Sequence, residues 1–143
     1  MQKNKGFSLI ELMIVVSIIA IIATIAIPNF LSFVSKTRRA EVKSNLSGIY
    51  KAEASYFGEK DTFSPSFMEI RWVPVGVAYY TYTLGAEEWG MDNTANPKPA
   101  SVVPVAADNG FLAFGWGNID NDSDVDVWSI NDLNIVVNVE SDV

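Results

Sequence analysis

Residues 6–11 read GFSLIE, and an apolar run continues from them to Ile27. Residues 7–27 hold 21 side chains, of which only Glu11 is charged. At about 1.5 Å per residue, a helix of this length measures about 30 Å, which is enough to cross the hydrocarbon core of a bilayer. A carboxylate within a membrane span costs roughly 2.5 kcal/mol or more at mid-membrane depth. We therefore expect Glu11 to have a function that offsets this cost.

A short basic leader precedes the apolar run. Residues 1–6 contain Lys3 and Lys5 and no apolar residue after Met1. A basic leader, a glycine, a phenylalanine and a glutamate five positions after the glycine resemble the type IV prepilins. An ordinary signal peptide has a shorter apolar region, about 7 to 15 residues long, and has no use for a glutamate within it. The strong match covers residues 6–28, roughly a sixth of the chain.

The resemblance implies a sequence of processing and assembly steps. A prepilin peptidase cuts between Gly6 and Phe7, and the new amino terminus of Phe7 is N-methylated. The precursor lies in the inner (cytoplasmic) membrane with its amino terminus in the cytoplasm. An assembly platform and an ATPase then extract the subunits into an extracellular filament, a helical homopolymer whose core is a bundle of the apolar helices. The residue that matches Glu11 pairs with the amino group of a neighbouring subunit.

Elementary electrostatics supports such a pairing. Cleavage before Phe7 creates an ammonium group one helical turn from Glu11, so the two ends of an intermolecular ion pair lie at similar depth. Moving a single charge from water into lipid costs free energy. In a buried ion pair, the attraction between the two charges nearly offsets this cost, so association of subunits lowers it. The alternative interpretation is an acid at the start of a helix, favoured by the helix dipole and reaching toward the headgroups.

Composition excludes several classes of protein. The chain has no cysteine and no histidine, which removes disulfides, thiolate metal sites and the commonest general base. Many pilins close a carboxy-terminal loop with a disulfide, so another contact must hold that region here. The net charge is -7, with thirteen acidic and two basic residues after residue 60. An acidic surface argues against binding to nucleic acid, and the composition argues against an enzyme.

The first part of the chain predicts one long helix. We divide the chain into a leader (1–6), an apolar assembly segment (7–28) and an amphipathic helix with a β-sheet head (29–143). Pro28 should end or kink the span, although the resemblance implies a curved, continuous helix at this assembly position. An apolar stripe of Phe30, Phe33, Val34, Val42, Leu46, Ile49, Tyr50, Ala54 and Phe57 follows helical spacing. Glu53 falls on the polar face, and Gly58 is a candidate C-cap.

The rest of the chain predicts strands. We expect them over residues 70–75, 77–84, 102–107, 111–116, 125–130 and 133–139, with a long loop over 85–101. Residues 111–116 and 125–130 form a hairpin. A long helix followed by antiparallel strands indicates an α+β fold, in which the apolar stripe packs on one face of the sheet.

Asp120, Asp122, Asp124 and Asp126 alternate along an acidic turn. The pattern resembles the start of an EF-hand loop, in which alternating oxygen ligands converge on Ca²⁺. It departs from that loop at Val125, where a glycine belongs, and at Asn131, where a glutamate belongs. A looser Ca²⁺ loop and a solvated hairpin turn therefore both stay open.

The sequence leads to one principal function and three alternatives. The principal one is a structural subunit of a type IV pilus that serves adhesion or motility. The others are a pseudopilin of a type II secretion system, a signal-anchored acidic binding protein that does not polymerise, and an enzyme. The chain has no phosphate-binding loop of the Gly-x-x-x-x-Gly-Lys type, so a separate ATPase must supply the energy of assembly.

Overall fold

The computed structural model describes residues 6–76, 79–90, 97–119 and 124–141. The chain divides into two compact units, Met1–Lys36 and Thr37–Val143, which we describe separately. A single helix, α1 (Leu9–Lys60), provides all helical residues of the first unit and the opening segment of the second.

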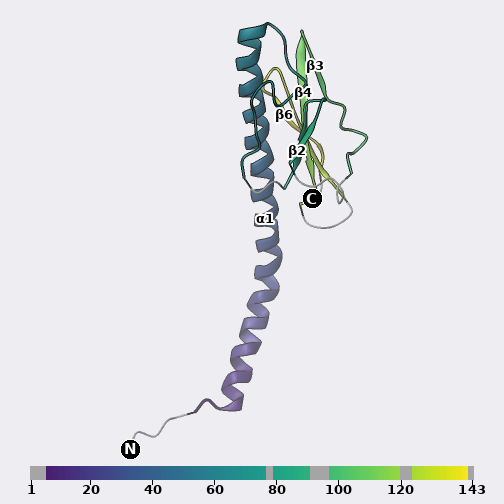
Figure 1. Cartoon of the computed structure of the whole chain (residues 1–143). Helices are drawn as coiled ribbons and strands as arrows, with labels where there is room; N and C mark the ends of the chain where they lie inside the picture. The colour runs from purple at the N-terminus through teal and green to yellow at the C-terminus, as the bar shows by residue number, and fades with distance from the viewer. Residues whose placement is uncertain (1–5, 77–78, 91–96, 120–123, 142–143) are drawn as a thin grey trace, which may run out of the picture. The chain divides into compact units, whose positions relative to one another are not determined.

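The second unit contains a six-stranded antiparallel sheet (Figure 1). Its strands are β1 (Thr81–Thr83), β2 (Glu88–Gly90), β3 (Val105–Ala107), β4 (Gly110–Gly117), β5 (Asp126–Asn131) and β6 (Val136–Glu140). Their order is β2-β1-β4-β5-β6, and β3 pairs with the part of β4 that β1 leaves open. The predicted α+β fold and the predicted hairpin of β4 with β5 are confirmed.

Residues of α1 beyond Lys36 pack on one face of the sheet. Val42, Leu46 and Ile49 recur at helical spacing and are fully buried. On the sheet side, this core receives Phe111 and other alternate side chains of β4 and β5, because side chains of a strand point to opposite faces in turn. Gly115 lies where α1 and β4 approach each other closely: a Cβ added there would be 2.8 Å from a methyl carbon of Val42.

The opposite face of the sheet has a second, smaller core. Phe114, Trp116 and Val127 point away from α1, and Val102 from the segment before β3 covers them. Both faces of β4 and β5 are therefore covered, and five consecutive residues in each strand are buried.

The helix continues through Pro28, as the resemblance implied, and does not end there. Three other predictions about α1 need correction. The helix continues through Gly58 to Lys60. Asp61, with φ of 58°, ends it in the left-handed conformation and donates its N–H to the Phe57 carbonyl at 2.8 Å, as in an αL C-cap. Glu53 is fully buried rather than on the polar face. Conversely, Phe30, Phe33 and Ala54 of the predicted buried stripe are exposed.

Residues 70–75 form no strand. The side chain of Asn45 on α1 hydrogen-bonds both backbone groups of Val75, accepting its N–H at 2.9 Å and donating to its carbonyl at 3.1 Å. These bonds, together with Pro74 and the positive φ of Arg71, replace the ladder that a neighbouring strand would supply.

The other strand boundaries also shift. Of the predicted strand 77–84, only Thr81–Thr83 is a strand, and residues 77–78 lie outside the described residues. The predicted loop 85–101 contains β2, whose Trp89 packs on the core, while residues 91–96 lie outside the described part. The strand predicted from residue 133 begins at Val136, because Asn131 accepts the N–H groups of Leu133 and Ile135 and closes a turn.

Candidate assembly and processing site

The predicted cleavage position lies just ahead of α1. Residues 6–8 are not helical, and the helix begins at Leu9. Gly6 has no other group within 4 Å of the position of a Cβ, and Phe7 is 76% exposed. The Gly6–Phe7 peptide bond therefore lies in a non-helical segment that is accessible to solvent.

Ser8 and Glu11 form a capping box at the start of α1. The Ser8 N–H and hydroxyl both donate to Glu11 Oε2, at 2.9 and 2.6 Å, and the Glu11 N–H donates to Ser8 Oγ at 3.3 Å. The arrangement satisfies backbone donors that the first turn of a helix otherwise leaves unpaired. Removal of residues 1–6 leaves it intact, because every participating atom belongs to Ser8 or Glu11.

The box thus accounts for one oxygen of the Glu11 carboxylate. Among the described residues, Oε1 accepts no hydrogen bond. A carboxylate with one oxygen fixed by the cap and the other open suits an external ammonium group. Sequence reasoning missed Ser8, although a serine three residues before a glutamate is the signal of a capping box.

The apolar part of α1 exposes its side chains all round. It is long and apolar enough to cross a membrane by length and composition, and no residue of its most apolar window is buried within the structure. Its few polar side chains form internal hydrogen bonds: Ser17, Thr24 and Asn29 each donate to the backbone carbonyl four residues earlier. Such bonds let the Ser17 and Thr24 hydroxyls enter an apolar medium without a free donor, and they satisfy one of the two N–H groups of the Asn29 amide.

Pro28 lies inside α1, as the resemblance implied. A proline cannot donate to the carbonyl four positions earlier, here that of Thr24. Asn29, the next residue, donates its side-chain amide to the Ile25 carbonyl at 3.1 Å. The helix therefore passes this point with one backbone bond fewer, which makes it the weakest turn of the apolar segment.

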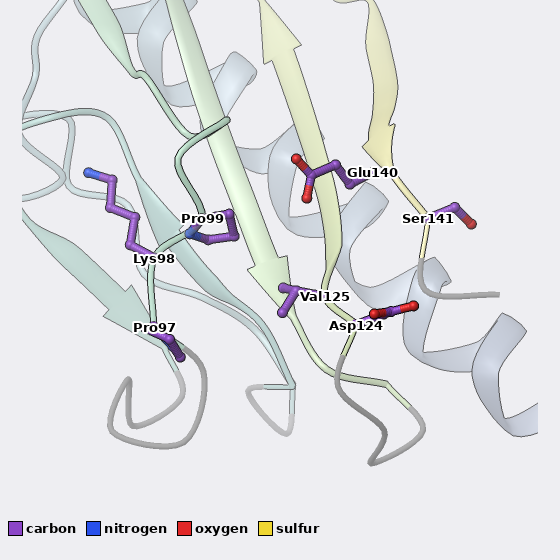
Figure 2. A pocket seen from close by; sticks show the side chains of 7 residues that line it. All are labelled: Pro97, Lys98, Pro99, Asp124, Val125, Glu140 and Ser141. Carbon is purple, nitrogen blue, oxygen red and sulfur yellow. The ribbon is translucent and has the colours of Figure 1, made fainter.

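The acidic turn is only partly described. Asp120 and Asp122 lie outside the described residues. Asp124 lines a surface hollow of about 390 Å³ together with Glu140 and Ser141, and Lys98 on the far side of this hollow extends away from it (Figure 2). The described residues contain no group of three or more acidic side chains that could hold a metal ion. Calcium binding by this turn stays a prediction.

Asp126 has a different environment from Asp124. It is fully buried and accepts from the Tyr80 hydroxyl at 2.7 Å, from the Asn138 amide at 3.0 Å and from the Trp128 indole N–H. Arg39 of α1 completes the set with an ion pair at 3.3 Å.

This cluster, which we call the Asp126 cluster (Arg39, Tyr80, Asp126, Trp128 and Asn138), joins α1 to both carboxy-terminal strands. Arg39 also donates to the Ser141 hydroxyl at 2.8 Å. Burial, with the Asp126 carboxylate as the next cause, raises the pKa of the Tyr80 phenol well above its ordinary value, so Tyr80 stays a donor. In a chain without cysteine, the cluster links β5 and β6 to the helix by hydrogen bonds and one ion pair.

Comparisons with known proteins agree with the amino-terminal motif. A family model described as "Prokaryotic N-terminal methylation motif" matches residues 1–27. The type IV major pilin protein PilA of Myxococcus xanthus (strain DK1622) is 43% identical over 112 residues, which are 76% of this chain and 51% of that protein. The fimbrial protein of Pseudomonas aeruginosa is 46% identical over 107 residues, 74% of this chain and 69% of that protein.

The type IV major fimbrial protein FimA of Dichelobacter nodosus is 52% identical over 106 residues, 74% of this chain and 66% of that protein. The chain thus spans about half the length of the Myxococcus relative and about two thirds of the other two.

Fold, site and relatives together define a class of proteins that carry an amino-terminal methylation motif on an apolar helix and a small α+β head behind it. Within that class, the chain belongs to the type IV pilin family.

Proposed function

We propose that this chain is a structural subunit of a type IV pilus, which assembles with further copies of itself through the apolar part of α1. The observation that carries the proposal is the exposed apolar surface of residues 9–36 behind a capped Glu11. Such a surface requires lipid before assembly and neighbouring helices after it. The role is structural and needs no catalysis by the subunit.

The precursor is a substrate of a prepilin peptidase that cuts between Gly6 and Phe7 and of an enzyme that methylates Phe7. The accessible Gly6–Phe7 bond supports the first step. We place the precursor in the inner membrane with its amino terminus in the cytoplasm, because Lys3 and Lys5 precede the span. The assembly platform and its ATPase are further partners in this proposal, and the assembled filament is extracellular.

In the filament, the ammonium group of Phe7 in one subunit pairs with the carboxylate of Glu11 in another. The capping box supports this step, because it holds Glu11 Oε2 and leaves Oε1 for the incoming donor. A heterologous contact of this kind does not close on itself and generates an open helical fibre.

Two measurements on native material test the proposal. Intact-mass spectrometry should find a product that begins at Phe7 and carries one added methyl group. For the Glu11→Ala variant, the same mass measurement should find processed subunit, and electron microscopy of the cells should find no surface fibres. An unprocessed native protein would rule out the pilin role, and normal fibres from Glu11→Ala would rule out the ion pair alone. Loss of protein secretion without loss of fibres, after deletion of the chain, would instead indicate a pseudopilin.

A further inference from the structure

Glu53 is a buried acid that neither assembly nor processing uses. It lies on the face of α1 that packs in the head, and its side chain is fully buried. Its Oε2 accepts the Ser64 N–H at 3.2 Å. Its Oε1 is also buried and has no hydrogen-bond partner among the described residues. A buried carboxylate oxygen without a partner is costly when the group is ionised and much less so when it is protonated.

A second carboxylate meets the same serine. The Ser64 hydroxyl donates to Glu69 Oε2, and the Tyr56 hydroxyl donates to the same oxygen at 3.4 Å. Ser64 therefore bridges two acids, with its backbone N–H on Glu53 and its hydroxyl on Glu69. The ion pairs formed by the described residues include neither acid.

Glu59 and Lys60 of α1 and Arg71 of the connection between α1 and β1 line the same surface hollow as Glu69 and Tyr56, and among the described residues no cation forms an ion pair with Glu53. Tyr56, on the same helix, interacts electrostatically with Glu53. Glu69, on the connection between α1 and β1, does so as well. Burial, opposed by the Ser64 N–H and reinforced by Glu69, raises the pKa of Glu53 to about 7.

We propose that Glu53 is a proton-operated latch for the connection formed by residues 61–72. In the protonated state the neutral Glu53 carboxyl stays buried beneath the connection, and its hydrogen bond with the Ser64 N–H holds the connection on α1. In the ionised state the buried charge beside Glu69 favours opening of the connection, so that water reaches the carboxylate. Glu69 and Tyr56 also line a surface hollow of about 310 Å³, which gives water a path to the cluster.

The sign of the pH dependence follows from linkage. The folded-state pKa of about 7 exceeds the ordinary value of 4.5, so the folded chain binds more protons than the opened chain between these two pH values. The stabilising effect is complete below the ordinary pKa and is lost as the pH rises through about 7. Acidification across the neutral range should therefore tighten the connection.

Hydrogen exchange of the full chain in detergent micelles tests the latch. Protection factors of peptides within residues 61–72, corrected for the intrinsic exchange rate, should fall at least about tenfold from about pH 5 to about pH 8. Glu53→Gln keeps an oxygen for the Ser64 N–H but cannot ionise, so its protection should not change with pH. Glu59→Gln, which alters an exposed acid of the same helix end, should behave like the wild type.

A pH-independent wild type, or a Glu53→Gln variant with the wild-type pH dependence, would overturn the proposal. If Glu53→Gln does not fold, Glu69→Gln provides the second test. Removal of the Glu69 charge should move the midpoint of the wild-type transition to lower pH, because Glu69 raises the pKa of Glu53. An unmoved midpoint would count against the latch. None of these outcomes depends on whether the chain forms pili.

Discussion

At the scale of single residues, substitutions at Ser8 and Glu11 can distinguish the effect of the helix cap on assembly from the effect of the proposed ion pair. Glu11→Gln keeps an oxygen for the capping box and removes the charge. Ser8→Ala keeps the charge and removes the cap, at a cost of about 1 kcal/mol. We expect surface fibres to disappear in Glu11→Gln and to persist in Ser8→Ala, as scored by electron microscopy. Fibres at wild-type density in Glu11→Gln would show that assembly does not need the charge.

A second residue-scale prediction concerns the Asp126 cluster. Asp126→Asn leaves the partly buried Arg39 without its counter-charge and turns one acceptor oxygen into a donor facing other donors. Loss of one partner of a buried pair costs about 3–5 kcal/mol, and we expect about 3 kcal/mol here because Arg39 keeps some contact with solvent. Urea unfolding of the full chain in micelles measures this loss. The exposed Asp124→Asn is the matched control and should change stability by less than about 0.5 kcal/mol.

At the scale of elements, the contact between α1 and β4 depends on a missing side chain. A Cβ at Gly115 would meet Val42 at 2.8 Å and Tyr82 at 3.0 Å, so Gly115→Ala should destabilise the head by about 1–3 kcal/mol. Gly58 is the matched control: it lies inside α1, and nothing is within 4 Å of its Cβ position. There the same substitution should stabilise by about 0.5–1 kcal/mol. Thermal unfolding of both variants should give shifts of opposite sign, and equal shifts would refute the close approach.

Some elements and site residues could be predicted from the local sequence, and others could not. Strands β4 and β5 were predictable because aromatic and β-branched residues alternate on both sides of a polar turn. The Gly6, Phe7 and Glu11 positions followed from a local motif. Asn45 and Glu53 could not be assigned in this way, since a polar residue on a helix is assumed to face solvent unless its partner is known. Their partners, Val75 and Ser64, are placed by tertiary packing.

The Asp126 cluster illustrates the same limit over longer separations. The alternating aspartates left a Ca²⁺ loop and a solvated turn both open, and neither interpretation identifies the donors to Asp126, which lie on α1, at Tyr80 and on β6. No local window of sequence contains these partners together. The ends of elements were missed for a related reason, because the left-handed residues Asp61 and Asn134, rather than a glycine, terminate the helix and shape the last turn.

At the scale of the whole molecule, the two units use apolar residues in opposite ways. The unit Met1–Lys36 exposes them, and the unit Thr37–Val143 buries them, with a core that begins at Val42. The charges divide similarly, since the first unit has three basic residues and one acidic residue, and the second has seven basic and sixteen acidic residues. One unit therefore requires lipid or other helices, whereas the other carries the features of a soluble acidic domain.

This division predicts that a chain beginning at Thr37 folds without detergent. The truncation removes no buried residue of the core and keeps Arg39 for the Asp126 cluster, and Thr37 is a favourable N-cap. We expect a soluble monomer by light scattering whose thermal midpoint lies within about 5 °C of that of the full chain in micelles. A chain beginning at Lys43 is the matched control. It loses both Val42 and the Arg39–Asp126 pair, and it should unfold at least about 10 °C lower, because each loss costs several kcal/mol in a head of this size. If both truncated chains aggregate to the same extent, the prediction that the unit Thr37–Val143 folds without the apolar segment is wrong.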